Sequence, residues 1–224
     1  MVPILATPTF LTSLRSIPHL PAHSWYYLAS VAFALLNRPD EIPHIYAYAT
    51  PNYDSVTVLN HTREALLKAS AIGGLPSTIN ALNALKTVVA EELLDQPTLS
   101  HRQEGALNLE EGDRLWDSIY GKVGPRVMRG MKRSYNDLGI VARMLYAGVL
   151  ADEGVLGKRE TGYVLVTGLV TGGDAWTAQR KGHRRGCVNN GATWEEVEAV
   201  ETLADKVVEE VRNSLGKEIV GREA

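Results

Sequence analysis

The chain of 224 residues contains a single cysteine and no apolar run long enough to cross a bilayer. One cysteine cannot form an internal disulfide, and it excludes a zinc site built on cysteine pairs. A lone free thiol fits a reducing compartment. The longest apolar stretch, Trp25 to Leu36, is shorter than the roughly 20 residues that a membrane-spanning helix needs. The sequence therefore predicts no membrane partner and no metal site.

The chain also lacks an excess of positive charge. It has 23 Lys and Arg against 26 Asp and Glu, which gives a net charge of −3. A nucleic-acid-binding face would normally make this balance basic, so we expect no nucleic-acid partner. The apolar fraction of 45% and the charged fraction of 22% are ordinary for a globular protein that buries a core.

The N-terminal segment contains no acidic side chain before Asp40. Its stretch TPTFLTSLRSIP is rich in hydroxyl groups and faintly resembles a mitochondrial presequence, but it has few basic residues and is interrupted by prolines. The final residues, Gly-Arg-Glu-Ala, do not match a peroxisomal targeting tripeptide. We therefore expect a cytoplasmic protein, with the mitochondrion as the alternative.

Apolar residues recur at helical spacing along nearly every long segment. After Thr193, valines and leucines from Val197 to Leu215 are spaced by three and four residues and form one stripe of a long helix. Thr193 and Glu196 have the spacing of a capping box, which predicts where this helix begins. Further helices are expected over 63–72, 77–94, 113–123, 138–152 and 159–171. The sequence therefore predicts an all-α fold.

The two halves of the chain follow a similar plan. Each has an apolar helix, a polar loop, a short helix that carries a histidine, and a capped long helix. The polar stretch 95–113 is the best linker candidate. We therefore expect an N-terminal helical half over 1–95 that is a degenerate repeat of a second half over 112–215. One compact domain is the alternative.

Two segments of the second half resemble the carboxymuconolactone decarboxylase and alkylhydroperoxidase D-like family, in its fungal form. They are Lys158 to Val170 (KRETGYVLVTGLV) and Gln179 to Val197 (QRKGHRRGCVNNGATWEEV). Met144 to Asp152 is similar to the helix that precedes them, and Arg63 to Leu85 matches more loosely. The resemblance covers about residues 112 to 213. It implies a bundle of antiparallel helices that assembles as a homo-oligomer, a trimer or a hexamer.

The chain departs from the peroxidase branch of that family at two positions. That branch carries a Cys-x-x-Cys motif seven and four residues before the histidine that corresponds to His183. Trp176 and Gln179 stand at these positions here. Neither side chain forms a thiolate or a disulfide, so the usual peroxidase mechanism is excluded.

The resemblance implies a pocket between helices that is lined by Glu160 and His183. Imidazole titrates near neutral pH and suits a general acid or base, and a half-buried carboxylate can share a proton with it. Alternatively, His183 lies in a solvated basic surface and Glu160 only offsets the dipole of its helix. The residues predicted to bind an anionic substrate are Arg180, Arg185, Trp176, Gln179 and Tyr146.

Three functions are compatible with these residues. The leading one is a cofactor-free acid/base enzyme, a decarboxylase or a related lyase or isomerase, that acts on a small carboxylated or lactone-type molecule. The second is a thiol-dependent peroxidase that uses Cys187 alone, although a single cysteine is more often a small core residue. The third is a non-catalytic oligomeric binding or scaffold protein.

Overall fold

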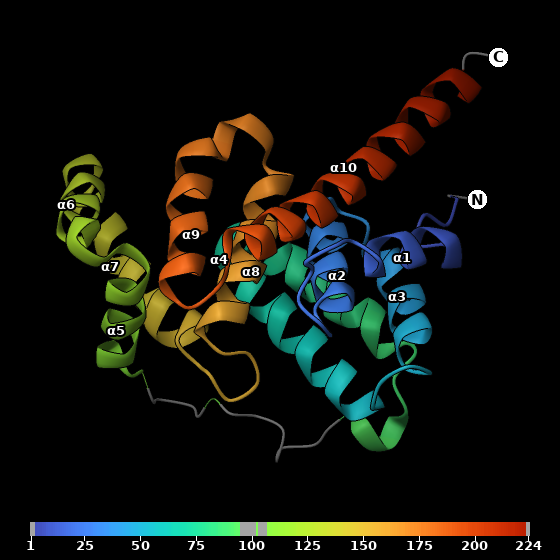
Figure 1. Ribbon diagram of the computed structural model, residues 1–224, viewed down its shortest axis with the longest axis horizontal. Coiled ribbons are helices and arrows are strands. Elements are labelled where there is room, and N and C mark those ends of the chain that lie inside the picture. The colour runs from blue at the N-terminus through green and yellow to red at the C-terminus, as the bar shows by residue number, and fades with distance from the viewer. Residues whose placement is uncertain (1–2, 95–101, 103–106, 223–224) are drawn as a thin grey trace.

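All regular elements in the part of the chain that the structure describes are helices (Figure 1). The computed structural model describes residues 3–94, 102 and 107–222, with side chains up to Leu215. The predicted all-α class is confirmed. The main helices are α1 (Pro8–Arg15), α2 (Trp25–Leu35), α3 (Ile42–Ala49), α4 (Ser55–Lys86), α5 (Leu109–Tyr120), α6 (Gly124–Ser134), α7 (Asn136–Leu145), α8 (Lys158–Thr171), α9 (Thr177–Asn189) and α10 (Trp194–Arg222).

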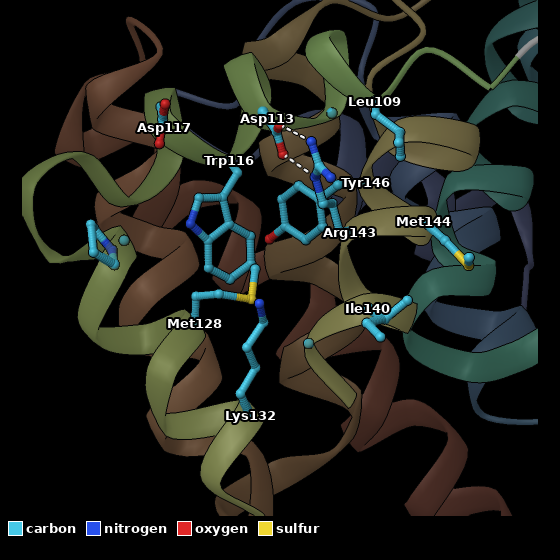
Figure 2. Close-up of a pocket in the computed structure, with 14 residues that line it drawn as sticks. Leu109, Asp113, Trp116, Asp117, Met128, Lys132, Ile140, Arg143, Met144 and Tyr146 are labelled. Atoms are coloured by element: carbon cyan, nitrogen blue, oxygen red, sulfur yellow. Dashed lines mark hydrogen bonds and ion pairs between the residues drawn. The ribbon is translucent and has the colours of Figure 1, made fainter. Parts of the chain in front are cut away.

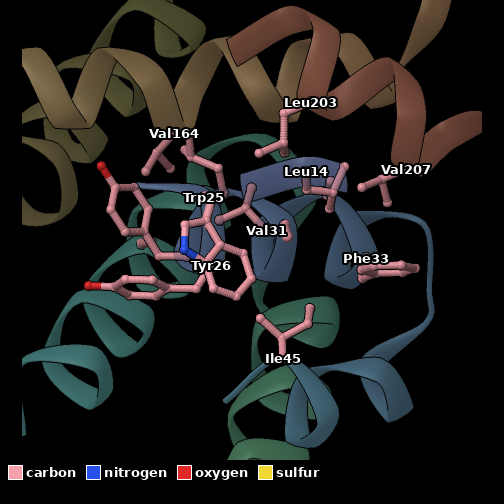
Figure 3. Packing of buried hydrophobic residues seen from close by; sticks show 14 of the residues in the cluster. Leu14, Trp25, Tyr26, Val31, Phe33, Ile45, Val164, Leu203 and Val207 are labelled. Carbon is pink, nitrogen blue, oxygen red and sulfur yellow. The ribbon is translucent and has the colours of Figure 1, made fainter. Parts of the chain in front are cut away.

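Two apolar helices, α2 and α8, form the centre of the molecule. Each is apolar on nearly all sides and is therefore buried nearly all round. Helix α2 packs against α4, α8 and α10, and α8 also packs against α4 and α9. The resulting hydrophobic core joins Leu14 and Phe33 to Val164 and Leu203 (Figure 3). The core thus includes residues from both predicted halves of the chain.

The same order of elements occurs twice along the chain. Helix α2 is followed by a 3-10 turn, η1 (Pro39–Glu41), the short α3 and the long α4. Helix α8 is followed by a 3-10 turn, η6 (Gly173–Trp176), the short α9 and the long α10. An evolutionary repeat stays a prediction. Most of the predicted linker, residues 95–101 and 103–106, lies outside the described residues.

Local signals in the sequence determine where α10 begins and where α4 bends. The backbone N–H of Thr193 donates to Glu196 Oε2 at 2.8 Å, and the N–H of Glu196 donates to Thr193 Oγ1 at 3.1 Å. The predicted capping box is therefore confirmed. Helix α4 is kinked at Gly74, whose φ of 76° lies in the left-handed region that glycine tolerates.

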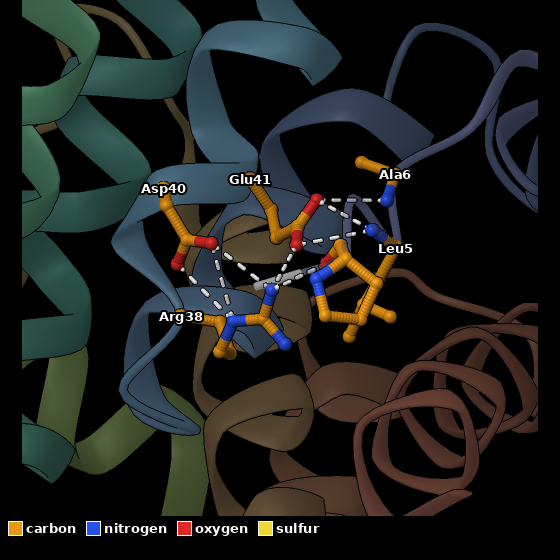
Figure 4. A network of polar contacts seen from close by, with 6 residues as sticks. Leu5, Ala6, Arg38, Asp40 and Glu41 are labelled. Atoms are coloured by element: carbon orange, nitrogen blue, oxygen red, sulfur yellow. Dashed lines mark hydrogen bonds and ion pairs between the residues drawn. The ribbon is translucent and has the colours of Figure 1, made fainter. Parts of the chain in front are cut away.

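A buried carboxylate holds the segment that precedes α1 (Figure 4). Glu41 is fully buried and accepts the backbone N–H groups of Leu5, at 3.1 and 3.0 Å, and of Ala6, at 2.8 Å. The Arg38 guanidinium also donates to Glu41 and to the carbonyl of Pro3. This network attaches the N-terminal segment to the start of α3.

Helices α6 and α7 form a hairpin at one side of the molecule, away from α2 and α10 (Figure 1). They pack on each other and on α5. Between α7 and the loop before α8 lies one turn of π-helix, η5 (Tyr146–Leu150), which packs against α5. Among the described residues, no helix combines the length and the hydropathy needed to cross a membrane.

Candidate functional site

The structure gives different surroundings to the two residues that were expected to share a proton. Glu160 lies in the first turn of α8, whereas His183 lies in the middle of α9 and is only 8% exposed. The two helices run in opposite directions, so the start of α8 faces the end of α9: a Cβ on Gly162 would lie 2.7 Å from Cys187 Sγ. Position 187, and not His183, is therefore the part of α9 that faces the start of α8.

The basic residues of α9 do not assemble an anion site with Glu160. Arg180 Nε lies 3.9 Å from a carboxylate oxygen of Glu201 on α10, and Arg184 Nε lies 3.3 Å from the other. Arg185 and Gln179 are exposed. Trp176 packs over Gly172. Of the residues predicted to bind substrate, only Tyr146 lines one of the two cavities described below.

The only cysteine is a core residue. Cys187 is fully buried, and burial raises the pKa of its thiol to about 12, with a further contribution from the negative charge of Glu201. The thiolate, which is the nucleophilic form, is therefore scarce near neutral pH. This environment does not suit a peroxidase that depends on Cys187.

Glu160 instead lines a cavity of about 680 Å³, and residues from both halves of the chain form its wall. Its volume is in the range of small-molecule sites. Aromatic and titratable side chains from α2, α4, α8 and two loops dominate its wall. These are His23, Tyr26, Tyr27, Tyr53, Asp54, His61 and Glu160. We call this the His61 cavity.

A hydrogen-bonded pair of side chains lies in the wall of the His61 cavity. The hydroxyl of Tyr26 lies 2.8 Å from His61 Nδ1, and the two rings are nearly parallel. Burial lowers the pKa of His61, an effect that the negative charge of Glu160 opposes. Burial raises the pKa of Tyr26 well above its ordinary value, as does the nearby Tyr53. Near neutral pH the pair is therefore a neutral imidazole and a protonated phenol.

The charges around the His61 cavity disfavour an anionic ligand. None of its lining residues is Lys or Arg. The Glu160 carboxylate accepts a hydrogen bond from Arg159 Nε at 3.2 Å, and Asp54 caps α4 through Thr57. This wall differs from the anion site expected from the sequence. Among the described residues, no cluster of three or more His, Cys, Asp or Glu side chains is placed to hold a metal ion.

Sequence reasoning did not identify Tyr26, Tyr27 and His61 as site residues. They follow no spaced motif, and they lie in the half that was interpreted as a degenerate repeat. One signal was present: two phenol hydroxyls stand at the start of an otherwise apolar helix, and a buried tyrosine hydroxyl usually requires a hydrogen-bond partner. That partner, His61, comes from a different helix.

His183 belongs to a second polar chain, next to a second cavity. Its Nε2 lies 3.3 Å from the hydroxyl of Tyr120, which lies 3.4 Å from the hydroxyl of Tyr146. Tyr146 lines a cavity of about 520 Å³ between α5, α6 and α7 (Figure 2). Burial lowers the pKa of His183 to about 4. This histidine is therefore neutral at physiological pH.

Acidification is expected to destabilise the protein through His183. The unfolded chain has the ordinary histidine pKa of 6.5, whereas the folded value is about 4. Between these values the unfolded chain binds more protons, so stability is lost as the pH falls from 6.5 to 4, by about 3 kcal/mol. Urea denaturation at several pH values should show a shallower pH dependence for His183→Gln. The control variant is His44→Gln, which removes an exposed histidine. If the stability of His183→Gln falls as steeply with pH as the stability of His44→Gln, the prediction is contradicted.

Two curated proteins are similar to this chain along most of their length. The chain is 31% identical over 194 residues to Peroxisomal protein 2 of Schizosaccharomyces pombe, with 85% of this chain and 87% of that protein covered. The chain belongs to the Peroxisomal protein 2 family. Peroxisomal protein 2 of Saccharomyces cerevisiae is 27% identical, with 80% of this chain and 86% of that protein covered. No model of a known protein family and no solved structure matches the chain.

Membership of the Peroxisomal protein 2 family corrects two expectations. Both relatives are named as peroxisomal proteins, and neither name describes a decarboxylase. The prediction of a decarboxylase or a related lyase or isomerase that acts on a small carboxylated or lactone-type molecule is therefore wrong. The prediction of a cytoplasmic or mitochondrial location is also wrong, since both names refer to the peroxisome.

Proposed function

We propose that this member of the Peroxisomal protein 2 family is a peroxisomal enzyme that transfers a proton to or from a small neutral molecule in the His61 cavity. The observation that carries the proposal is the Tyr26–His61 hydrogen bond of 2.8 Å in the wall of that cavity. The names of the two relatives support the location. The proposal uses neither the His183–Glu160 pair nor a carboxylated substrate.

The roles follow from the protonation states in the cavity. When Nδ1–H of His61 donates to the Tyr26 oxygen, Nε2 is the nitrogen that accepts a proton from a bound hydroxyl or amine. Because burial lowers the pKa of His61, the imidazole is present in the accepting, neutral form. The negative charge of Glu160 then stabilises the imidazolium that forms. Tyr26 is a positioning residue that orients the ring.

We further propose that the Peroxisomal protein 2 family is distantly related to the alkylhydroperoxidase D-like proteins. Support comes from the succession of α8, α9 and α10, with His183 within α9 and the Thr193–Glu196 box before α10. A trimeric or hexameric assembly stays a prediction of that resemblance.

The proposed activity depends on His61. We expect purified protein to convert at least one neutral compound in a peroxisomal metabolite extract, measured by mass spectrometry. His61→Gln should lower the rate about 100-fold or more, because general base catalysis contributes on that order. Tyr26→Phe should lower the rate less and shift its pH profile, because it removes the hydrogen bond that orients the ring.

The matched control is His44→Gln, which removes an exposed histidine of α3 outside the cavity wall. It should turn over the same compound at the wild-type rate. Equal rates for His61→Gln and the wild type would refute the role of His61. An extract in which no compound changes would refute the enzymatic function itself.

A further inference from the structure

The second cavity, between α5, α6, α7 and η5, has a largely apolar wall (Figure 2). Trp116 and Tyr146 form its floor, and both are nearly buried. Ile140 and Met144 stand on the α7 side and remain 42% and 50% exposed. Met128 completes the wall from α6. A volume of about 520 Å³ with apolar walls is in the range of sites for small organic ligands.

Two of the four charged side chains in this wall pair with each other. Arg143 Nε donates to Asp113 Oδ1 at 2.7 Å, so these two charges satisfy each other. Lys132 also lines the cavity, and it forms no hydrogen bond or ion pair with any other described residue. Its stem lies against α7, where a Cβ on Gly139 would lie 2.6 Å from Lys132 Cγ. The ammonium group of Lys132 is therefore free to meet a ligand.

The electrostatic surroundings favour a negative charge beside Lys132. Helix α6 also carries Arg126, Arg129 and Arg133, and the sequence has no acidic residue from 118 to 136. The unpaired carboxylate in the wall is that of Asp117, and Trp116 stands between it and Lys132 in Figure 2. The charged lining residues are thus the Arg143–Asp113 pair, Asp117 and Lys132, and the rest of the wall is largely apolar.

We propose that this cavity binds a linear monocarboxylate with an apolar tail. The carboxylate pairs with Lys132, and the tail lies along Trp116, Met128 and Met144. A charge-assisted hydrogen bond from the ammonium fixes the head, and burial of methylene groups supplies most of the affinity. This site is separate from the His61 cavity and does not depend on the function proposed there.

Isothermal titration with decanoate and dodecanoate, both below the concentration at which they form micelles, tests the site. Each buried methylene contributes about 0.8 kcal/mol, so dodecanoate should bind about 15-fold more tightly than decanoate. Lys132→Ala should weaken decanoate binding about tenfold and leave the binding of decanol, which lacks the charge, unchanged. Lys122→Ala removes an exposed cation outside the cavity wall and should have no effect.

A second variant tests whether the ligand binds inside the cavity. Ile140→Glu puts a carboxylate on a partly exposed wall position and should abolish decanoate binding, while its thermal unfolding remains close to that of the wild type. His61→Gln should leave decanoate binding unchanged, so this test is independent of the proposed enzyme.

Four results would overturn the proposal. In the first two, the protein binds neither acid, or Lys132→Ala binds decanoate as tightly as the wild type does. In the other two, the wild type binds decylamine as tightly as decanoate, or it binds only to vesicles of anionic phospholipid. The last result would assign the basic and apolar hairpin to a membrane surface instead.

Discussion

Replacement of Glu41 by alanine is expected to lower the free energy of unfolding by about 3–5 kcal/mol. The carboxylate is fully buried and accepts the N–H groups of Leu5 and Ala6 and the guanidinium of Arg38. Its removal leaves the mostly buried Arg38 with a weaker set of partners and leaves two backbone donors in an apolar site without acceptors. Both losses act in the same direction, because buried polar groups are costly when unpaired.

Chemical denaturation of Glu41→Ala measures the change, and Asp40→Ala is the matched control. The Asp40 side chain also pairs with Arg38 but is 55% exposed, so its loss should change stability by less than about 1 kcal/mol. Limited proteolysis should cleave before α1 faster in Glu41→Ala, since the network fixes that segment. Equal stability of the two variants would mean that Glu41 does not hold the N-terminal segment.

Replacement of Lys68 by alanine is expected to have an effect of similar size, about 3–5 kcal/mol. The Lys68 side chain is fully buried in α4, and Nζ donates to the carbonyls of Leu150 and Asp152 at 2.6 Å each. Nζ also lies 3.4 Å from Glu64. Burial lowers the pKa of Lys68 to about 8, which the charge of Glu64 opposes. The variant therefore removes the ammonium donor from one buried and one partly buried carbonyl, and it leaves the buried carboxylate of Glu64 with one cation fewer.

Lys68→Met separates packing from polar contacts, because methionine keeps an apolar stem and loses the ammonium. It should recover part of the stability lost in Lys68→Ala, and the remaining loss measures the bonds to the carbonyls. Lys86→Ala, at the exposed end of the same helix, should change stability by about 0.5 kcal/mol or less in the same urea titration. If Lys68→Ala is as stable as Lys86→Ala, the buried ammonium does not join α4 to η5.

The sequence by itself determined the features that depend on neighbouring residues. Helical periodicity predicted the all-α class, because the side chains of one helix face are set by spacing alone. The length of the 159–171 segment and its position among other helices predicted the buried α8. The Thr193–Glu196 box predicted the start of α10, since both hydrogen bonds join residues three apart. The preference of a lone cysteine for the core predicted the burial of Cys187.

Only the tertiary structure decided which titratable groups meet. Tyr26 and His61 come from α2 and α4, and Glu160 joins them from α8 across the core shared by both halves of the chain. His183 turns instead toward Tyr120 of α5. No local spacing encodes these contacts, because each one results from how whole apolar helices pack. The sequence thus predicted the helices and the chemical groups they carry, and the packing of α2, α4 and α8 decided which groups share a cavity.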